Sequence, residues 1–204
     1  MIDPELSLWD AWQPADVARL LNGVHVPWYV AAGWALDLFV GEQRREHEDL
    51  EIAVPNSRVD ELLPALDGLE LFVITGPQEA TPLEQARDRL DETHQTWVRE
   101  PATGLWRFDL FREPSEGDTW ICRRDASIRM PYSELIQWSN GIPYGRPEVI
   151  LLYKAKHAER ERDQGDFAEL LPLLEPERRR WLAEALELVH PGHKWLAELV
   201  GSRR

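Results

Sequence analysis

Apolar and polar positions alternate most clearly between Trp28 and Val54. This stretch starts with a short apolar run that is expected to form a strand. A compact helical segment follows, opening at Gly33 and Trp34 and ending at Gly41. Glycine commonly ends a helix because it adopts the left-handed conformation without steric cost. A strand, a glycine turn and a short helix are therefore predicted in immediate succession.

A second strand is predicted at 49–54, after a charged link. Successive residues of a strand point to opposite faces, so its three apolar residues would face a core and leave Asp49 and Glu51 together on the other face. The same pattern also fits acids on the solvent face of a half-exposed strand. Two carboxylates on a rigid strand suit Mg²⁺, which prefers oxygen ligands. The preceding turn at a helix N-terminus offers N–H groups to a phosphate.

The spacing of apolar residues in the rest of the chain predicts a mixed α+β fold. Helices are expected at 14–21, 58–66, 148–160, 166–174, 176–188 and 193–200, and strands at 69–74, 95–99, 105–111, 120–122 and 128–130. Segment 75–91 is polar and interrupted by proline and glycine, so a loop with a short helix is expected rather than a strand. Segment 132–146 is predicted to be a connector. From Pro147 onward the spacing of apolar residues is that of helices alone. Two domains are therefore predicted, 1–146 and 147–204.

The net charge, the apolar runs and the cysteine count exclude several classes of protein. The net charge of −14 repels polyanions, which argues against a protein that tracks DNA or RNA. It suits a cationic small molecule, although acidity also simply favours solubility. No apolar run approaches the roughly 20 residues that span a bilayer, and no basic and apolar leader is visible, so no membrane and a cytoplasmic location are expected. Cys122 is the only cysteine, which excludes an intrachain disulfide. Monomer and homodimer both stay open.

This order of features resembles the DNA polymerase β-like nucleotidyltransferase superfamily, in which a Gly-Gly or Gly-Ser turn precedes a strand carrying Asp-x-Asp or Asp-x-Glu. The chain is most similar to the small antibiotic nucleotidyltransferases of the aminoglycoside-2″-adenylyltransferase and lincosamide types. The likeness is carried by Gly33-Trp34-Ala35-Leu36-Asp37, Gly41, Arg45-Glu46-His47-Glu48-Asp49-Leu50-Glu51-Ile52, the segment 147–156, Arg162-Asp163 and Asp166-Phe167. Ala32 departs from the pattern because it replaces the first glycine of the pair, and Glu51 replaces the commoner second Asp.

The resemblance implies a nucleotidyltransferase domain with a small mixed sheet, followed by a helical domain. It also implies that Asp49 and Glu51 bind Mg²⁺ and that a third carboxylate lies on a neighbouring strand. Asp109 is the candidate, because an acid between two large apolar residues is costly unless it is paired or coordinated. Pairing with Arg107 or Arg112, or a place at the sheet edge, would explain Asp109 without a metal.

Four further residues are candidates for binding the nucleotide. Gly33 and Trp34 would contact the triphosphate through backbone N–H groups. His47 could hydrogen-bond a phosphate or orient a carboxylate, and Lys154 would reach the triphosphate from the helical domain. In the simpler alternative, His47 and Lys154 are surface residues and Trp34 is a core residue.

Two other pairs of charged residues have simpler explanations at this point. Arg44 and Arg45 form a charge run that is expected to be solvated, although contact with phosphate is possible in principle. Asp163 and Asp166 match a family motif at a helix start, where helix capping explains at least one of them.

The predicted reaction is Mg²⁺-dependent transfer of a nucleoside monophosphate from an NTP, with ATP as the expected donor, to a hydroxyl group of a small molecule. An aminoglycoside-like or lincosamide-like antibiotic is the acceptor that the resemblance suggests. Two alternatives stay open. One is an adenylyltransferase that modifies a protein, as in toxin–antitoxin pairs, and the other is a nucleotide-binding relic of the fold without catalysis.

Overall fold

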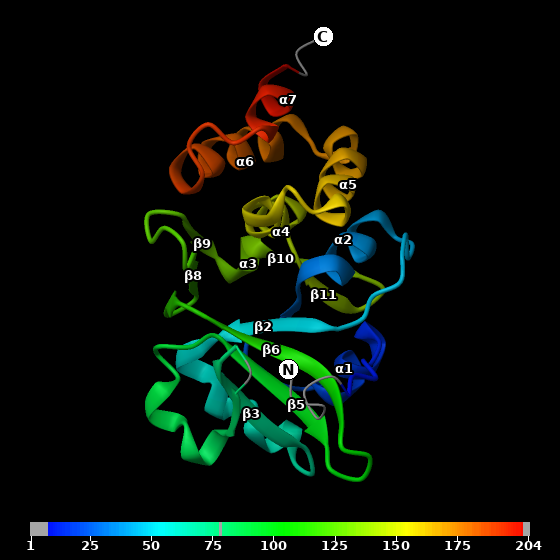
Figure 1. Ribbon diagram of the computed structural model, residues 1–204, viewed down its shortest axis with the longest axis vertical. Helices are drawn as coiled ribbons and strands as arrows, with labels where there is room; N and C mark the ends of the chain where they lie inside the picture. Colours follow the sequence, from blue (N-terminus) through cyan, green and yellow to red (C-terminus); the bar gives the residue numbers. More distant parts are fainter. Residues whose placement is uncertain (1–7, 78, 202–204) are drawn as a thin grey trace.

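The computed structural model describes residues 8–77 and 79–201, in which a mixed sheet lies below a group of helices formed by the end of the chain (Figure 1). The sheet has eight strands in the order β10-β11-β1-β2-β6-β5-β3-β4. Their bounds are β1 Tyr29–Val30, β2 Glu51–Pro55, β3 Glu70–Gly76, β4 Glu79–Pro82, β5 Gln95–Glu100, β6 Leu105–Glu113, β10 Ile136–Ser139 and β11 Ile142–Gly145. A smaller sheet contains β7 Ser115–Glu116, β8 Thr119–Ile121 and β9 Arg129–Pro131.

The α-helices lie mainly above the sheet in the view of Figure 1. Their bounds are α1 Pro14–Leu20, α2 Ala32–Val40, α3 Tyr132–Leu135, α4 Pro147–Lys154, α5 Glu161–Leu170, α6 Pro176–Val189 and α7 Trp195–Gly201. The 3-10 helices are η2 Asn56–Glu61, η3 Leu63–Leu66, η4 Leu83–Gln85, η5 Arg87–Arg89, η6 Ala155–His157 and η7 Leu171–Leu173. Helix α4 packs against α2, α5 and α6, and so connects the helical region to the helix that follows β1. No helix within the described residues is long and apolar enough to cross a membrane.

Strand β2 lies at the middle of the sheet, antiparallel to β1 and parallel to β6. Its register places Glu51 opposite Asp109, so two acids that are distant in sequence occupy adjacent positions on neighbouring strands. The predicted alternation is confirmed, because Leu50, Ile52 and Val54 are all fully buried. The predicted mixed α+β fold class is confirmed as well, and the predicted strands at 95–99 and 105–111 are found as β5 and β6, which pair antiparallel.

The predicted helix at 58–66 is wrong. Two 3-10 helices, η2 and η3, occupy this segment instead, and Pro64 lies in the first turn of the second one. Proline has no N–H and its ring clashes with the preceding turn, so it prevents one continuous α-helix.

Two segments that were predicted to lack strands contain them. Strand β4 falls in the predicted loop 75–91 and pairs antiparallel with β3 at one edge of the sheet. The predicted connector 132–146 forms helix α3 and the hairpin β10–β11, which extends the sheet beyond β1. The hairpin turns at Asn140 and Gly141, whose φ angles are 50° and 79°. Asn-Gly with two positive φ angles is typical of a type I′ hairpin turn.

Candidate active site

The sheet register brings Glu51 and Asp109 together. Asp109 is 4% exposed, and its Oδ2 accepts hydrogen bonds from Gln95 Nε2 at 2.5 Å and Trp97 Nε1 at 3.2 Å. Its Oδ1 is buried and makes no hydrogen bond to another described residue. A buried carboxylate oxygen without a partner is costly. The free oxygen of Asp109 is therefore an available ligand or proton acceptor next to Glu51.

The simpler explanations of Asp109 do not hold. Arg107 forms ion pairs with Asp10 and Glu100 instead. Arg112 donates to hydroxyl, amide and backbone oxygens around the end of β6. Strand β6 lies inside the sheet between β2 and β5, so Asp109 is not at an edge either. The charge of Asp109 acts on Arg112, but no ion pair with another described residue accounts for this acid.

Burial and neighbouring acids raise the pKa of two of the predicted metal ligands, Glu51 and Asp109. Burial, with a smaller contribution from the charge of Asp49, raises the pKa of Asp109 to about 7, although the hydrogen bonds from Gln95 and Trp97 act to lower it. Burial, followed by the charges of Asp49 and Asp109, raises the pKa of Glu51 well above its usual range. A divalent cation would relieve this repulsion, and all the donors are carboxylate oxygens, which Mg²⁺ prefers. The residues present therefore fit the ion in charge and donor chemistry.

The position of Asp49 differs from the prediction. Strand β2 begins at Glu51, so Asp49 lies in the loop before the strand and is exposed. Among the described residues, no three Asp, Glu, His or Cys side chains converge closely enough to hold a metal ion. Asp49 and Glu51 line one cavity, and Asp109 lies beside Glu51 on the neighbouring strand without lining it.

That cavity has a volume of about 220 Å³ and contains five of the seven residues selected from the sequence. They are Gly33, His47, Asp49, Glu51 and Lys154. Asp109 joins the group from the neighbouring strand through its register with Glu51. Trp34 does not line this cavity. Its ring is 7% exposed and packs on His47 with 4.4 Å between ring centroids, so only its backbone N–H remains a candidate for binding phosphate.

The turn before α2 has the predicted form. Ala32, at the position of the family's first glycine, has a φ of 49°, in the left-handed region that glycine favours. Gly33 has an ordinary φ but little space, because a Cβ there would lie 2.6 Å from atoms of both Arg45 and His47. The first N–H groups of a helix have no partner within the helix. The start of α2 is therefore suited to bind an anion.

His47 is not the surface residue of the simpler explanation. Its side chain is 3% exposed, and Nε2 lies 2.6 Å from Oδ2 of Asp37 on α2. Burial lowers the pKa of His47 although the hydrogen bond to Asp37 acts to raise it. The neutral imidazole therefore donates its Nε2 proton to Asp37. Trp34 covers one face of the ring.

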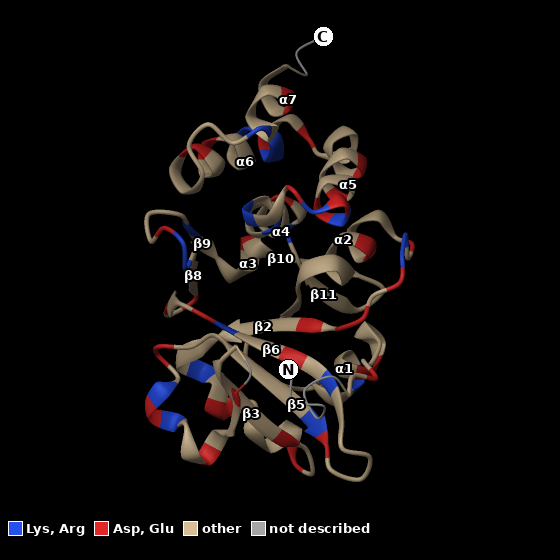
Figure 2. Cartoon of the chain, viewed as in Figure 1, with Lys and Arg blue, Asp and Glu red and all other residues tan. Residues whose placement is uncertain are grey.

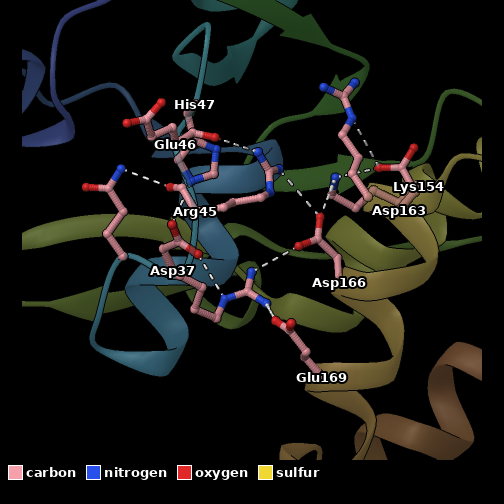
Figure 3. A network of polar contacts seen from close by, with 11 residues as sticks. Asp37, Arg45, Glu46, His47, Lys154, Asp163, Asp166 and Glu169 are labelled. Atoms are coloured by element: carbon pink, nitrogen blue, oxygen red, sulfur yellow. Dashed lines mark hydrogen bonds and ion pairs between the residues drawn. The ribbon is translucent and has the colours of Figure 1, made fainter.

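Lys154 is likewise not an ordinary exposed lysine. Its ammonium lies 2.8 Å from Asp163 and 2.9 Å from Asp166, and all three side chains are nearly buried (Figure 3). Helix capping does not explain the two aspartates, because Arg160 occupies the N-cap of α5 and makes no side-chain capping bond. That expectation is wrong, and the reason is that both carboxylates turn toward α4.

A second cavity of about 540 Å³ adjoins the first, and it was not predicted from the sequence. Four residues line both cavities, namely Ala32, Glu51, Lys154 and Arg162. The larger cavity is rich in cations, which are Arg123, Arg124, Lys154, Lys156, Arg160 and Arg162. In Figure 2 blue segments lie on the β8–β9 connection and near the start of α5. Lys156 and Arg160 form no ion pair with another described residue.

Cations outnumber the acids that line this cavity, which are Glu51, Glu113 and Asp163, although the chain carries −14. Burial, and then the charges of Arg123, Arg112 and Lys156, lower the pKa of His94 on its wall to about 4. Arg124 donates to the backbone oxygens of Leu152 and Tyr153, so no carboxylate neutralises it in these bonds. In the sequence, the run of basic residues between 154 and 162 was the signal from which this cationic cavity could have been predicted.

The fold is that of small nucleotidyltransferases. A structure described as ANT(2″)-Ia in complex with adenylyl-2″-tobramycin is 11% identical, with a TM-score of 0.56 over 85% of this chain and 95% of that one. A solution structure of ANT(2″)-Ia is 13% identical, with a TM-score of 0.53 over 86% and 94%. The lincosamide antibiotic adenylyltransferase LnuA, with lincomycin bound, is 17% identical, with a TM-score of 0.52 over 83% and 96%.

Residues 15–95 match the family model of aminoglycoside-2″-adenylyltransferase. The predicted resemblance is therefore confirmed, and the predicted enzyme class, nucleotidyltransferase, is that of this family and of the structural neighbours. The matched segment includes Gly33, His47, Asp49 and Glu51 and ends before Asp109. No curated protein sequence matches the chain significantly.

Proposed function

We propose that the protein transfers a nucleoside monophosphate from an NTP, with ATP as the expected donor, to a hydroxyl group of a small molecule, releasing pyrophosphate. One observation carries the proposal. The unpartnered, buried Oδ1 belongs to Asp109, which lies in register with Glu51, and Glu51 lines both the cavity beside the acidic loop and the cationic cavity. An acid cluster beside a cation-lined cavity suits a metal-bound polyphosphate and has little other use in a soluble core.

The nucleotide is assigned to the 540 Å³ cavity because of its charge. Lys156 and Arg160 carry charges that no described acid neutralises, and Lys154 and Arg162 lie where the two cavities meet. A triphosphate would neutralise Lys156 and Arg160, and Lys154, which already pairs with Asp163 and Asp166, would contact it from the helical side. Its phosphates would also reach the N–H groups at Gly33, where the helix N-terminus favours an anion.

Asp49 and Glu51 would hold Mg²⁺ on the nucleotide side, and Asp109 would complete the donor set. When bound, the ion supplies neutralisation of charge on the phosphates and on the acceptor oxygen. Oδ1 of Asp109 accepts the proton of the acceptor hydroxyl, since Gln95 and Trp97 already occupy Oδ2. The acceptor oxygen forms a bond to the α-phosphorus, and the bond to pyrophosphate breaks. Gln95 and Trp97 hold the carboxylate in place, so catalysis rests on positioning.

A small antibiotic is the proposed acceptor. Two of the structural neighbours hold adenylyl-2″-tobramycin and lincomycin, respectively. Glu46, Glu48 and Asp49 are exposed on the loop that lines the smaller cavity, and they would attract a cationic acceptor. A cationic aminoglycoside is therefore expected to be a better acceptor than a neutral sugar with the same hydroxyl.

Release of pyrophosphate across a panel of aminoglycosides and lincosamides, with each NTP, tests the proposal. Asp109→Asn is expected to reduce turnover about 10²–10⁴-fold, the usual contribution of a general base, while Mg²⁺–NTP affinity changes by no more than a few-fold. Asp49→Asn is expected to abolish both binding and turnover in a folded protein. Asp88→Asn, which removes a charge at an exposed position lining neither cavity, is the matched control.

Three results would contradict the proposal in different ways. NTP binding that is unchanged by EDTA would remove the metal role of Asp49 and Glu51. Magnesium-dependent binding without pyrophosphate release for any acceptor would favour a nucleotide-binding relic. Transfer of labelled nucleotide to a protein in a cell extract, with no transfer to the antibiotics, would favour a protein-modifying enzyme.

A further inference from the structure

Arg44 is the centre of an ion-pair network that joins the two parts of the site. Its Nε lies 2.9 Å from Asp37, its Nη2 lies 3.1 Å from Asp166 and its Nη1 lies 2.7 Å from Glu169. Figure 3 shows these three acids converging from α2 and α5. The Arg44 side chain is only 12% exposed, so the expectation of a solvated charge is wrong. Arg44 lines neither cavity and is not placed to contact a ligand.

On one side of Arg44, the network reaches the loop before β2. Asp37 uses Oδ1 for Arg44 and Oδ2 for His47. His47 lies two residues before Asp49 and lines the smaller cavity. Through Asp37, Arg44 therefore fixes the carboxylate that holds the His47 ring.

On the other side, the network reaches Lys154. Asp166 uses Oδ1 for Arg44, while its Oδ2 lies 2.9 Å from Lys154 and 3.6 Å from Arg45. Burial acts to raise the pKa of Asp166, but Lys154 and the two neighbouring arginines outweigh it and hold the pKa below its usual range. Asp166 is therefore a buried carboxylate ion, and Arg44 fixes the orientation in which it meets Lys154.

We propose that Arg44 is a positioning residue for nucleotide binding, acting through Asp166 on Lys154. The inference rests on the proposed function. The planar guanidinium of Arg44 directs three separate N–H groups at three carboxylates, which a lysine ammonium cannot reproduce in one plane. Helix α5, which carries Asp166, and the loop that carries Asp49 are held in one arrangement as a result. Lys154 then meets the triphosphate from a fixed direction.

Arg44→Lys keeps the positive charge and removes the planar guanidinium with its three separately directed N–H groups, so it tests the proposal directly. Coupling through one residue of a network is commonly worth 0.5–2 kcal/mol, so the Kd for Mg²⁺–ATP, measured by tryptophan fluorescence, is expected to rise about 2- to 30-fold. Arg58→Lys is the matched control, since Arg58 pairs with Glu61 on the surface and lines neither cavity. That control is expected to leave the Kd unchanged.

A double-mutant cycle distinguishes positioning from general stabilisation. In a Lys154→Gln background, Arg44→Lys is expected to have little further effect on the Kd, because the residue through which it acts is gone. A purely structural role would lower the melting temperature and leave the Kd of the folded fraction unchanged. If Arg44→Lys does not fold, Asp166→Asn tests the same link from α5.

The outcomes separate the inference from the function on which it rests. A wild-type protein that does not bind Mg²⁺–ATP would refute the proposed function. Wild-type binding with an unchanged Kd for Arg44→Lys, or equal effects of Arg44→Lys with and without Lys154, would overturn the positioning role alone.

Discussion

Gly33 offers the sharpest test of the packing around the phosphate-binding turn. Its φ is not in the left-handed region, so alanine is acceptable to the backbone there. The obstacle is space, because an added Cβ would lie 2.6 Å from Arg45 Nη2 and from Cε1 and Nδ1 of His47. Arg45 Nη2 is the end of a flexible side chain and can move. The His47 ring is held by Asp37 and covered by Trp34, so it can move only by breaking those contacts.

The size of the effect follows from these distances. Ordinary contact begins near 3.4 Å, so the His47 ring must retreat by about 0.8 Å from its position at 2.6 Å. Overpacking of this kind typically costs about 1–3 kcal/mol. Alanine is a better helix former than glycine by roughly 0.5–1 kcal/mol, which offsets part of the cost. Gly33→Ala is therefore expected to destabilise the protein by about 1–2 kcal/mol, which lowers the melting temperature of a chain this size by roughly 2–8 °C.

Gly165 supplies a matched control on α5. It also has an ordinary φ within a helix, and a Cβ added there would meet nothing within 4 Å. Gly165→Ala is expected to stabilise the protein by about 0.5–1 kcal/mol through helix propensity alone. Thermal melts and urea titrations followed by tryptophan fluorescence measure both variants. The two substitutions are chemically identical, so opposite signs can come only from their surroundings.

Removing the obstacle should reverse the effect. In a His47→Ala background, Gly33→Ala is expected to be neutral or slightly stabilising, because the Cβ then has room. Stabilisation by Gly33→Ala in the wild-type background, equal to that by Gly165→Ala, would refute the close packing of His47 on the turn. An equal loss of stability with and without His47 would move the cause from the ring to Arg45.

Two further predictions concern strain and pH. Ala32→Gly is expected to raise stability by about 0.5–1 kcal/mol in urea titrations, since release of left-handed strain of roughly 1–2 kcal/mol exceeds the extra freedom of unfolded glycine; a loss of stability would show that Ala32 is not strained. The pKa of His94 is lowered from 6.5 to about 4 in the folded protein, so the unfolded chain binds more protons than the folded one between these two pH values. The contribution of neutral His94 to the free energy of unfolding is therefore fully present above pH 6.5 and is lost as the pH falls toward 4. Urea titrations across this range are expected to show a loss of about 1–3 kcal/mol that His94→Gln reduces; an equal loss in both proteins would place the titrating group elsewhere.

Local signals were enough to select several residues that the structure places around one cavity. The alternation at 49–54 and the glycines that flank α2 each depend on a few consecutive residues, because strand pleat and helix capping act over that range. Asp109 could also be selected from the sequence, because burying an acid within an apolar strand costs free energy unless the acid is paired or coordinated. Its register with Glu51 was not accessible from periodicity, because parallel pairing joins segments that have no fixed separation in sequence.

The errors have a common physical origin in contacts that are not local. Strand β4 is polar because it lies at the sheet edge, so it lacks the apolar pattern of an inner strand. Arg44 belongs to a charged run that resembles a solvated surface, and only the approach of α5 buries it. Asp163 and Asp166 have the spacing of helix-start acids, and only the position of Lys154 shows what they bind. Asn140-Gly141 is an exception, since this turn signal was present in the sequence.

The distribution of charge explains how an acidic protein can bind an anionic nucleotide. A net charge of −14 repels polyanions at long range, but salt screens exposed charges beyond about 10 Å. Inside the larger cavity, Lys156 and Arg160 have no acidic partner in the part of the chain that the structure describes, and they act at short range where screening is weak. Binding of the nucleotide in this proposal is therefore less sensitive to salt than is attraction of a cationic acceptor to the exposed acids at 46–49. This separation of charges predicts two results. The KM for the acceptor should rise with ionic strength, and the Kd for Mg²⁺–ATP should stay nearly constant.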